Sequence, residues 1–217
     1  MKLIAIETST DICSIAYIQE GKCENIIEEK IPRQHAEKLP FFYNELVNQF
    51  KFELSDIDAM AVSIGPGSFT GLRIGLSYAK GLAYSHKKPI IPVPTMLSLF
   101  YGNGIENGDV AVVMHSHGIK YFIQNFNYVN KKLTSDKIQV YELNNIKEVK
   151  ELVADSKIIH YGCNKLFNNA NKNIQIKEVK PSSKWIGELA HKNYNKWIIS
   201  KPYKLVPDYV YPFKIGK

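Results

Sequence analysis

The segment that says most about the fold of this chain is Ile64-Gly65-Pro66-Gly67-Ser68-Phe69-Thr70-Gly71-Leu72-Arg73-Ile74-Gly75. It joins residues 59–64, which are too apolar for an edge strand, to a run from about residue 69 to 84 that has the spacing of a helix. Backbone N–H groups at a helix N-terminus attract anions, and glycines let a ligand approach them closely. One interpretation of the segment is therefore a phosphate cradle, and the other is close packing.

Neither of two well-known phosphate-binding motifs fits this segment. A P-loop requires GxxxxGK[ST], but Leu72 follows Gly71 here. A dinucleotide-binding fold carries GxGxxG directly after its first strand, whereas this segment follows the strand that we predict to be the fourth. Phosphate binding thus stays an open alternative without a motif that supports it.

The helix after the loop carries a stripe of very small residues. They recur at every fourth position, so that one side of the helix has almost no side chain. The members of the stripe are Gly71, Gly75, Ala79 and Ala83. Polar residues are confined to Arg73, Ser77 and Lys80, and one sheet cannot cover all of the remaining apolar surface. We expect part of this helix to face another helix or another protein, with packing inside the chain as the alternative.

Periodicity on both sides of the segment predicts an α/β domain. Toward the N-terminus, helical spacing links Leu39, Phe42, Leu46 and Phe50, and three short runs before them have the pattern of strands. The predicted strands cover residues 3–6, 13–18, 25–27, 59–64 and 89–93, and the predicted helices begin at residues 35, 69 and 95. The order β-β-β-α-β-α-β-α is that of a ribonuclease-H-like domain.

A turn-rich break at residues 102–108 separates this half from a less patterned one. We therefore predict two domains, residues 1–102 and residues 103–217. In the second domain we expect strands at residues 110–114, 121–126 and 158–161 and a helix at residues 184–199.

The formal net charge of +7 is distributed unevenly. Residues 1–100 carry 10 basic and 11 acidic side chains, whereas residues 101–217 carry 18 basic and 10 acidic ones. The strongly basic second half suggests that it faces a polyanion such as RNA, although a lysine-rich solvated surface explains the charge equally well.

Three cysteines without a CxxC pair predict reduced thiols rather than a disulfide framework. No apolar run approaches the roughly 20 residues that a bilayer-spanning helix needs. The N-terminus reaches Glu7 before a signal-peptide core could form. We expect a cytoplasmic protein with no membrane partner.

Four segments, Ile4–Thr10, Ser14–Ala16, His35–Pro40 and Gly65–Gly75, together resemble the TsaB family of bacterial tRNA threonylcarbamoyladenosine biosynthesis proteins, and GPGSFTGLRIG is the most specific of them. The resemblance implies a member of the actin, hexokinase and sugar-kinase superfamily, built from two ribonuclease-H-like lobes of which the second is smaller and degenerate. The second half departs from the family, since Met114–Tyr121 keeps only the glycine and the tyrosine of the family's pattern there.

The resemblance further implies a non-catalytic scaffold or activator subunit that forms a heterodimer with TsaD through helices of the first lobe. Together with TsaE, such a complex installs threonylcarbamoyl on the adenosine beside the anticodon of tRNAs that read codons starting with A. Whether the chain forms a homodimer in the absence of TsaD is left open. The residues that we expect at the partner interface are Leu39, Phe42, Leu46, Gly71, Gly75, Ala79 and Ala83.

In the superfamily, the turn after the first strand contacts phosphates, and an acid in it holds the water of a metal ion. Glu7, Thr8, Ser9 and Thr10 occupy that turn here, as a vestigial phosphate turn. A second acidic-glycine turn and an adenine-binding glycine cluster are missing. We expect no cofactor of the chain's own, with ATP or ADP at most at the junction with TsaD. The alternative is an independent ATP-dependent phosphotransferase or ATPase that uses Glu7.

No catalytic or metal-binding set emerges from the remaining residues. The position four residues after His35 is Leu39, so that no zinc-binding pair of histidines forms on this helix. His115 and His117 lie two residues apart but lack a third ligand nearby. No Ser-His-Asp or Cys-His arrangement is recognisable. We predict neither catalytic residues nor a metal site.

Overall fold

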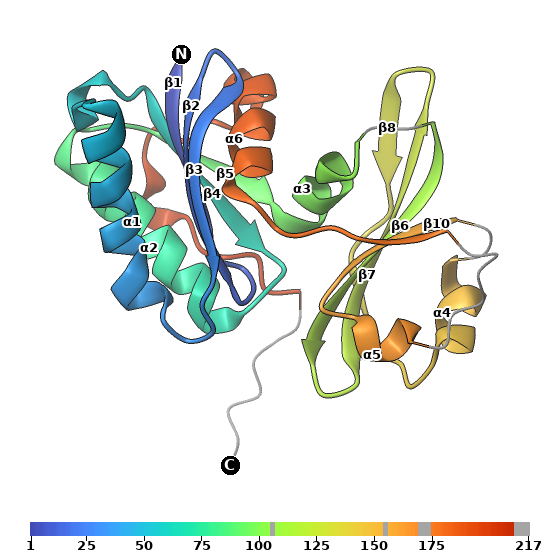
Figure 1. Cartoon of the computed structure of the whole chain (residues 1–217). Coiled ribbons are helices and arrows are strands. Elements are labelled where there is room, and N and C mark those ends of the chain that lie inside the picture. Colours follow the sequence, from blue (N-terminus) through green and yellow to red (C-terminus); the bar gives the residue numbers. More distant parts are fainter. Residues whose placement is uncertain (105–106, 154–155, 169–174, 211–217) are drawn as a thin grey trace. The chain divides into compact units, whose positions relative to one another are not determined.

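The computed structural model describes residues 1–104, 107–153, 156–168 and 175–210, and these form two compact units. Unit 1 contains Met1–Ser98 and Pro181–Asp208, and unit 2 contains Leu99–Lys180 together with the described residues from Tyr209. Each unit is built on one mixed β-sheet (Figure 1). No described helix combines the length and the apolar character that crossing a membrane requires.

The sheet of unit 1 has five strands in the order β3-β2-β1-β4-β5. The first three form an antiparallel meander, and β4 and β5 add to β1 in parallel, as expected for strands that helices connect. Ala5 of β1 is paired with Ala16 on one side and with Ala61 on the other. The strands are β1 (Lys2–Glu7), β2 (Ile12–Gln19), β3 (Lys22–Lys30), β4 (Ala59–Gly65) and β5 (Ile90–Pro94).

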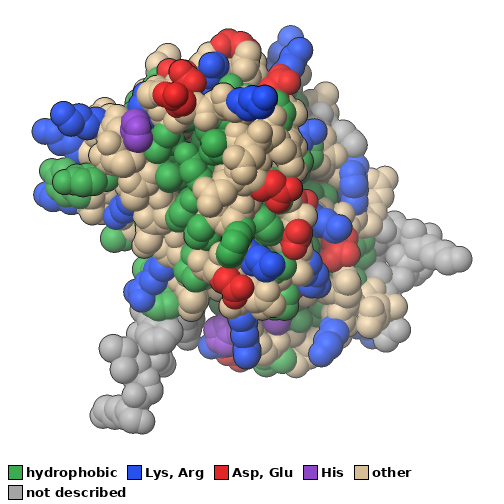
Figure 2. All heavy atoms as spheres, turned by 60° about the vertical axis from the view of Figure 1, so that its left-hand side comes forward, with side chains coloured by type: hydrophobic (Ala, Val, Ile, Leu, Met, Phe, Trp, Pro, Cys, Tyr) green, Lys and Arg blue, Asp and Glu red, His purple; other side chains and the backbone are tan. Residues whose placement is uncertain are grey.

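Helices α1 (His35–Phe50) and α2 (Phe69–Ser85) cover one face of this sheet, and α6 (Ser183–Lys192) covers the other (Figure 1). Alternate residues of the strands supply the two faces, because successive side chains of a strand point to opposite sides. Ile4 and Ile6 belong to the core beneath α1 and α2, whereas Ala5 faces α6. The outward side of α1 and α2 mixes hydrophobic and charged side chains (Figure 2).

The C-terminal part of the chain departs from the predicted division into residues 1–102 and 103–217. The predicted helix at residues 184–199 is two helices, α6 and α7 (Tyr194–Trp197), and both belong to unit 1. A Cβ on Gly187 would lie 2.3 Å from Ile18 Cγ1 and 3.0 Å from Ala5 Cβ, so α6 lies almost directly on the sheet. The apolar sheet face that contains Ala5 and Ile18 is buried by α6, a segment far along the chain.

Unit 2 has a six-stranded sheet in the order β11-β10-β6-β7-β8, with β9 paired to the remaining part of the β7 edge. The strands expected at residues 110–114, 121–126 and 158–161 are the middle of the sheet, while the peripheral elements were not predicted. The strands are β6 (Gly108–His117), β7 (Lys120–Val129), β8 (Lys132–Ser135), β9 (Gln139–Glu142), β10 (Lys157–Tyr161) and β11 (Ile176–Glu178). Helices α4 (Ile146–Val153) and α5 (Asn164–Phe167) pack on one face, and Phe100, in the helix α3 (Thr95–Gly102), stacks on Phe126.

Candidate functional site

The turn Glu7–Thr10 and the glycine loop, which the sequence singled out separately, form one site. Because β1 and β4 are parallel neighbours, the segments that follow their carboxyl ends meet at the same edge of the sheet. The Thr8 hydroxyl donates a hydrogen bond to the Gly71 carbonyl at 2.8 Å. The backbone N–H of Ser68 donates to the Ser9 carbonyl at 2.6 Å. The start of α2 is therefore fastened to the turn that follows β1.

Three glycines make this close approach possible. A Cβ on Gly67 would lie 2.4 Å from the Ser9 carbonyl oxygen, and one on Gly71 would lie 2.1 Å from the Thr8 carbonyl oxygen. A Cβ on Gly75 would lie 2.2 Å from the Thr8 hydroxyl oxygen. These distances are far below van der Waals contact, so any side chain would force the helix away from the turn. The glycines of this loop thus serve packing within the chain.

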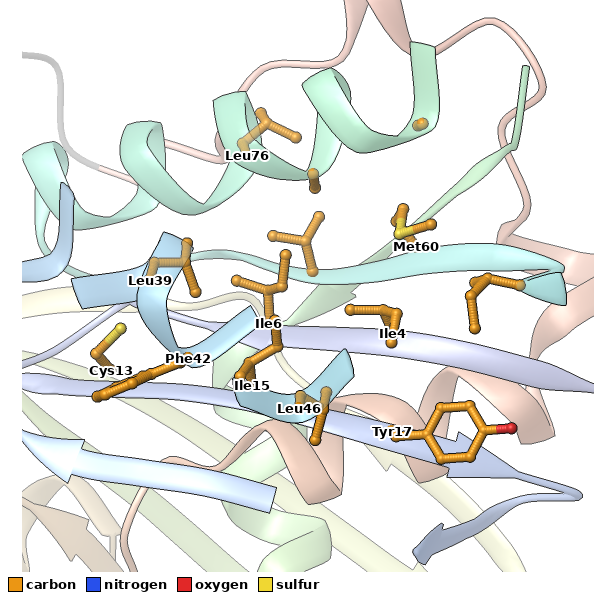
Figure 3. Close-up of a cluster of buried hydrophobic side chains, with 14 of the residues drawn as sticks. Ile4, Ile6, Cys13, Ile15, Tyr17, Leu39, Phe42, Leu46, Met60 and Leu76 are labelled. Atoms are coloured by element: carbon orange, nitrogen blue, oxygen red, sulfur yellow. The ribbon is translucent and has the colours of Figure 1, made fainter. Parts of the chain in front are cut away.

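The structure corrects the list of expected interface residues. All seven are buried inside unit 1, where the two helices face their own sheet. Figure 3 shows Leu39, Phe42 and Leu46 among the side chains of the core, together with Ile6 of β1. Ala79 and Ala83 belong to the same core, with exposed fractions of 0% and 1%. The stripe of small residues therefore allows α2 to approach the sheet, and a partner could contact only the opposite side of these helices.

Glu7 is fully buried at the end of β1, and burial raises the pKa of its carboxyl group, because a charge in this position would lose its hydration. Its Oε1 accepts a hydrogen bond from the Ser9 N–H at 2.5 Å, which opposes the rise of the pKa without cancelling it. Its Oε2 is buried together with the Ser9 and Ser63 hydroxyls, and hydrogen bonding from these two hydroxyls also opposes the rise of the pKa. The carboxyl group is therefore enclosed by the chain's own polar groups, and its pKa stays above the ordinary value.

Two serines from other elements form a bonded pair next to Glu7 in the strand register, and the sequence did not indicate them as site residues. Ser14 is paired with Glu7 across β1 and β2, and its hydroxyl lies 2.6 Å from the Ser183 hydroxyl. Ser14 also donates to Glu28 Oε2 at 3.0 Å and accepts from the Ser183 N–H at 3.1 Å. The strand register of the meander places Ser14 and Glu28 beside Glu7, so pairing the predicted strands could have identified these two residues. Ser183 lies in α6, far along the chain, and no local pattern links it to Glu7.

The residues of the turn fit a nucleotide phosphate poorly. Thr8 and Ser9 are buried, and the Thr8 hydroxyl and the Ser9 carbonyl are bonded to α2 and the loop before it. At the start of α2, the N–H groups of Gly71 and Leu72 bond to Ser68, which leaves them unavailable to an anion. Thr10 uses its hydroxyl to accept the Ile12 N–H at 3.2 Å. The Thr8 hydroxyl and the Ser9 carbonyl are thus engaged by α2 and the glycine loop rather than left for a ligand.

The outward side of α1 and α2, in contrast to the Glu7–Thr10 turn, presents apolar side chains to a possible partner. Tyr43 of α1 and Tyr78 of α2 meet edge to face, with 6.0 Å between their ring centroids, and burial raises the pKa of both hydroxyls. Phe41 is 64% exposed on α1. On α2, the Arg73 guanidinium lies 3.6 Å from the centroid of the Phe69 ring. Hydrophobic side chains gather in the middle of this face in Figure 2.

Two histidines lie within hydrogen-bond distance of backbone carbonyls, and the three cysteine thiols are at least partly buried. His35 Nε2 lies 3.1 Å from the Ile12 carbonyl, and His115 Nε2 lies 3.1 Å from the Gly118 carbonyl. The described residues contain no group of three side chains arranged to hold a metal ion. Burial raises the pKa of Cys13 and Cys163 to about 12 and that of Cys23 to about 11, so that these thiols are poor nucleophiles.

Comparison with known proteins connects this fold to one family. The family model TsaD, tRNA N6-adenosine threonylcarbamoyltransferase, matches residues 22–184. The tRNA threonylcarbamoyladenosine biosynthesis protein TsaB of Escherichia coli is 36% identical over 113 residues, which cover 52% of this chain and 48% of that protein. The chain spans about half the length of the curated relatives it matches.

Solved structures share the fold at lower identity. A Pseudomonas aeruginosa protein described as similar to the peptidase YeaZ superimposes with a TM-score of 0.78 at 22% identity, covering 97% of this chain and 99% of that one. An activator of the 2-hydroxyisocaproyl-CoA dehydratase from Clostridium difficile, solved with ADPNP, superimposes with a TM-score of 0.55 at 9% identity over 90% of this chain and 96% of that one. The chain thus shares its fold with both of these structures.

Proposed function

Because the chain belongs to the TsaD family of tRNA N6-adenosine threonylcarbamoyltransferases, we propose that it acts in the synthesis of threonylcarbamoyladenosine in tRNA as a non-catalytic, TsaB-like partner of a TsaD-type protein. The observation that carries this proposal is the closed turn at Glu7–Thr10. Its polar groups are buried or bonded to the chain itself, which favours a role without catalysis of its own.

The outward side of α1 and α2 is the surface that we assign to the TsaD-type partner. Phe41, Tyr43, Ile74 and Tyr78 offer apolar area there, and an apolar centre within a polar rim is the usual anatomy of a protein interface. TsaE joins the resulting complex, with tRNA as its substrate. In the absence of the partner, the same surface supports a homodimer. ATP or ADP binds, in this proposal, only at the junction with the TsaD-type protein.

Co-purification of this chain with the TsaD-type protein of the same organism, followed by size exclusion with light scattering, tests the proposal. Phe41→Glu and Ser77→Glu place a charge at exposed positions of α1 and α2, and we expect each to abolish the complex while the isolated chain keeps its unfolding temperature. Ile119→Glu is the matched control, since Ile119 is 47% exposed but lies in unit 2. A complex that survives both outward substitutions contradicts the assigned surface.

An independent ATP-dependent phosphotransferase or ATPase is the second candidate. One observation favours it: the Glu7 carboxyl group and the Ser9 and Ser63 hydroxyls are buried together in the described structure, at the edge where this fold class binds ligands. Turnover of ATP by the isolated chain that is lost in Glu7→Gln would establish this function. Equal background turnover in the native chain and the variant would exclude it.

A further inference from the structure

The division into units assigns part of the basic charge of the second half to unit 1, for a net of +3 once Glu188 and Asp208 are counted. Of the 18 basic side chains after residue 100, five lie in the segment Pro181–Asp208, which returns to unit 1. They are Lys184, Lys192, Lys196, Lys201 and Lys204. The basic side chains of the second half are therefore divided between the two units, and those of this segment belong to unit 1.

Strand pairing brings this segment to the edge of the sheet. Ile199 exchanges both backbone hydrogen bonds with Ile90 of β5, at 2.8 and 3.0 Å, in an antiparallel bridge. Lys201 follows this bridge by two residues, and Lys88 precedes it by two residues on the neighbouring segment. The N–H groups of Lys87 and Lys88 bond to the carbonyls of Tyr84 and Ala83, which folds this turn against the end of α2.

A second contact fixes the chain beyond Lys201. The Lys80 ammonium group of α2 donates hydrogen bonds to the Tyr203 carbonyl at 3.2 Å and to the Leu205 carbonyl at 2.6 Å. Lys204 lies between these two anchored residues, and Tyr84 stands one helical turn beyond Lys80 on the same side of α2. Residues from the end of α2, the turn before β5 and the C-terminal segment thus share one surface.

This β5-edge surface, which consists of Tyr84, Lys87, Lys201, Tyr203 and Lys204, combines exposed cations with exposed aromatic rings. All three lysines are exposed, and Tyr84 and Tyr203 have exposed fractions of 88% and 69%. Large aromatic rings exposed to this extent contribute nothing to the core.

We propose that the β5-edge surface binds the phosphodiester backbone and unstacked bases of RNA. Lysine ammonium groups neutralise phosphates, and tyrosine rings provide platforms on which bases of any sequence stack. Lys88 is excluded from the contact set because its ammonium group bonds to the Ser55 carbonyl at 2.6 Å, beside Asp56. The proposal of RNA binding is supported by the charge and exposure of these side chains. Only the identification of the RNA as tRNA depends on the proposed function.

Fluorescence anisotropy with a labelled, unmodified tRNA transcript tests this inference on the full-length chain. We expect the triple variant K87Q/K201Q/K204Q to bind at least about tenfold more weakly and to reduce the slope of log K against log salt by about 2–3, since three phosphate contacts are lost. Tyr84→Ala and Tyr203→Ala should each weaken binding about tenfold and leave the salt slope unchanged, because stacking releases no counterions.

The matched control is K147Q/K150Q/K165Q, which removes the same charge from exposed positions of unit 2. An equal loss of affinity in this control would show general electrostatic attraction and overturn the inference. Equally tight binding of polyglutamate or of phosphatidylserine vesicles would overturn it as well, in favour of an acidic protein or a membrane surface. Co-purification with the TsaD-type protein is scored separately, so that loss of RNA binding and failure of the proposed function are distinguished.

Discussion

Gly75 and Thr8 lie so close together that the glycine has no room for a side chain, since a Cβ on Gly75 would stand 2.2 Å from the Thr8 hydroxyl oxygen. The hydroxyl is held in place because it donates to the Gly71 carbonyl at 2.8 Å. One threonine thus fixes the turn after β1 to two successive turns of α2. The glycine-rich segment is explained by this contact, and the contact predicts how the chain responds to substitution.

Gly75→Ala should destabilise the chain by about 1–3 kcal/mol, because the added methyl group overpacks the contact with Thr8. Gly81→Ala in the same helix is the control: nothing lies within 4 Å of a Cβ at that position. Alanine there should raise the free energy of unfolding by up to about 1 kcal/mol through helix propensity. Urea denaturation measures both values. Equal effects of the two substitutions would contradict the packing role of Gly75.

Glu7 should make the chain less stable as the pH rises. Burial raises the pKa of this carboxyl group in the folded state above its ordinary value of 4.5. Below pH 4.5 both states are protonated and the stabilisation is complete. Above it, the unfolded state releases its proton first, so that the free energy of unfolding falls by at most about 1.4 kcal/mol per pH unit until the folded pKa is reached. Urea midpoints of the native chain and of Glu7→Gln, compared from about pH 4 upward, should diverge in this window; parallel curves would refute the shift.

Lys80 should hold the C-terminal segment on α2. Lys80→Met keeps the aliphatic stem but removes the hydrogen bonds to the carbonyls of Tyr203 and Leu205, and we expect a loss of about 1–2 kcal/mol. The Asp208 N–H, which bonds to the Ile64 carbonyl at 2.7 Å, should then exchange its hydrogen faster. Hydrogen exchange with mass spectrometry reports this change, with the exposed Lys87→Met as control. Unchanged exchange would show that the segment is held by its apolar contacts alone.

The division into units predicts which fragment folds. Residues 1–102 alone lack α6, which leaves the sheet face with Ala5 and Ile18 uncovered and removes the Ser183 partner of Ser14. We expect this fragment to aggregate or to unfold without a cooperative transition. Residues 1–98 joined by a flexible linker to residues 181–208 should unfold cooperatively in thermal denaturation. A cooperative transition of the shorter fragment would show that α6 is dispensable.

The first half of the sequence predicts its secondary structure well, because each element there carries its own period. Leu39, Phe42 and Leu46 mark the buried side of α1, and the apolar run before Gly65 marks β4 as an inner strand. The small peripheral strands of unit 2, such as β8 with all four residues exposed, carry no such signal. Their position depends on pairing with β7, which no local pattern records.

Local patterns along the chain are enough to predict the α/β class, the order of elements up to residue 102 and very close packing along α2. The neighbour that packs there follows from the fold alone: it is the chain's own turn at Thr8, and not a partner protein. The fold also shows that α6 belongs to unit 1 and that Lys80 of α2 bonds to backbone carbonyls of the C-terminal segment. The physical reason is that periodicity records which side of an element is buried, whereas the identity of the neighbour depends on contacts between residues far apart in the chain.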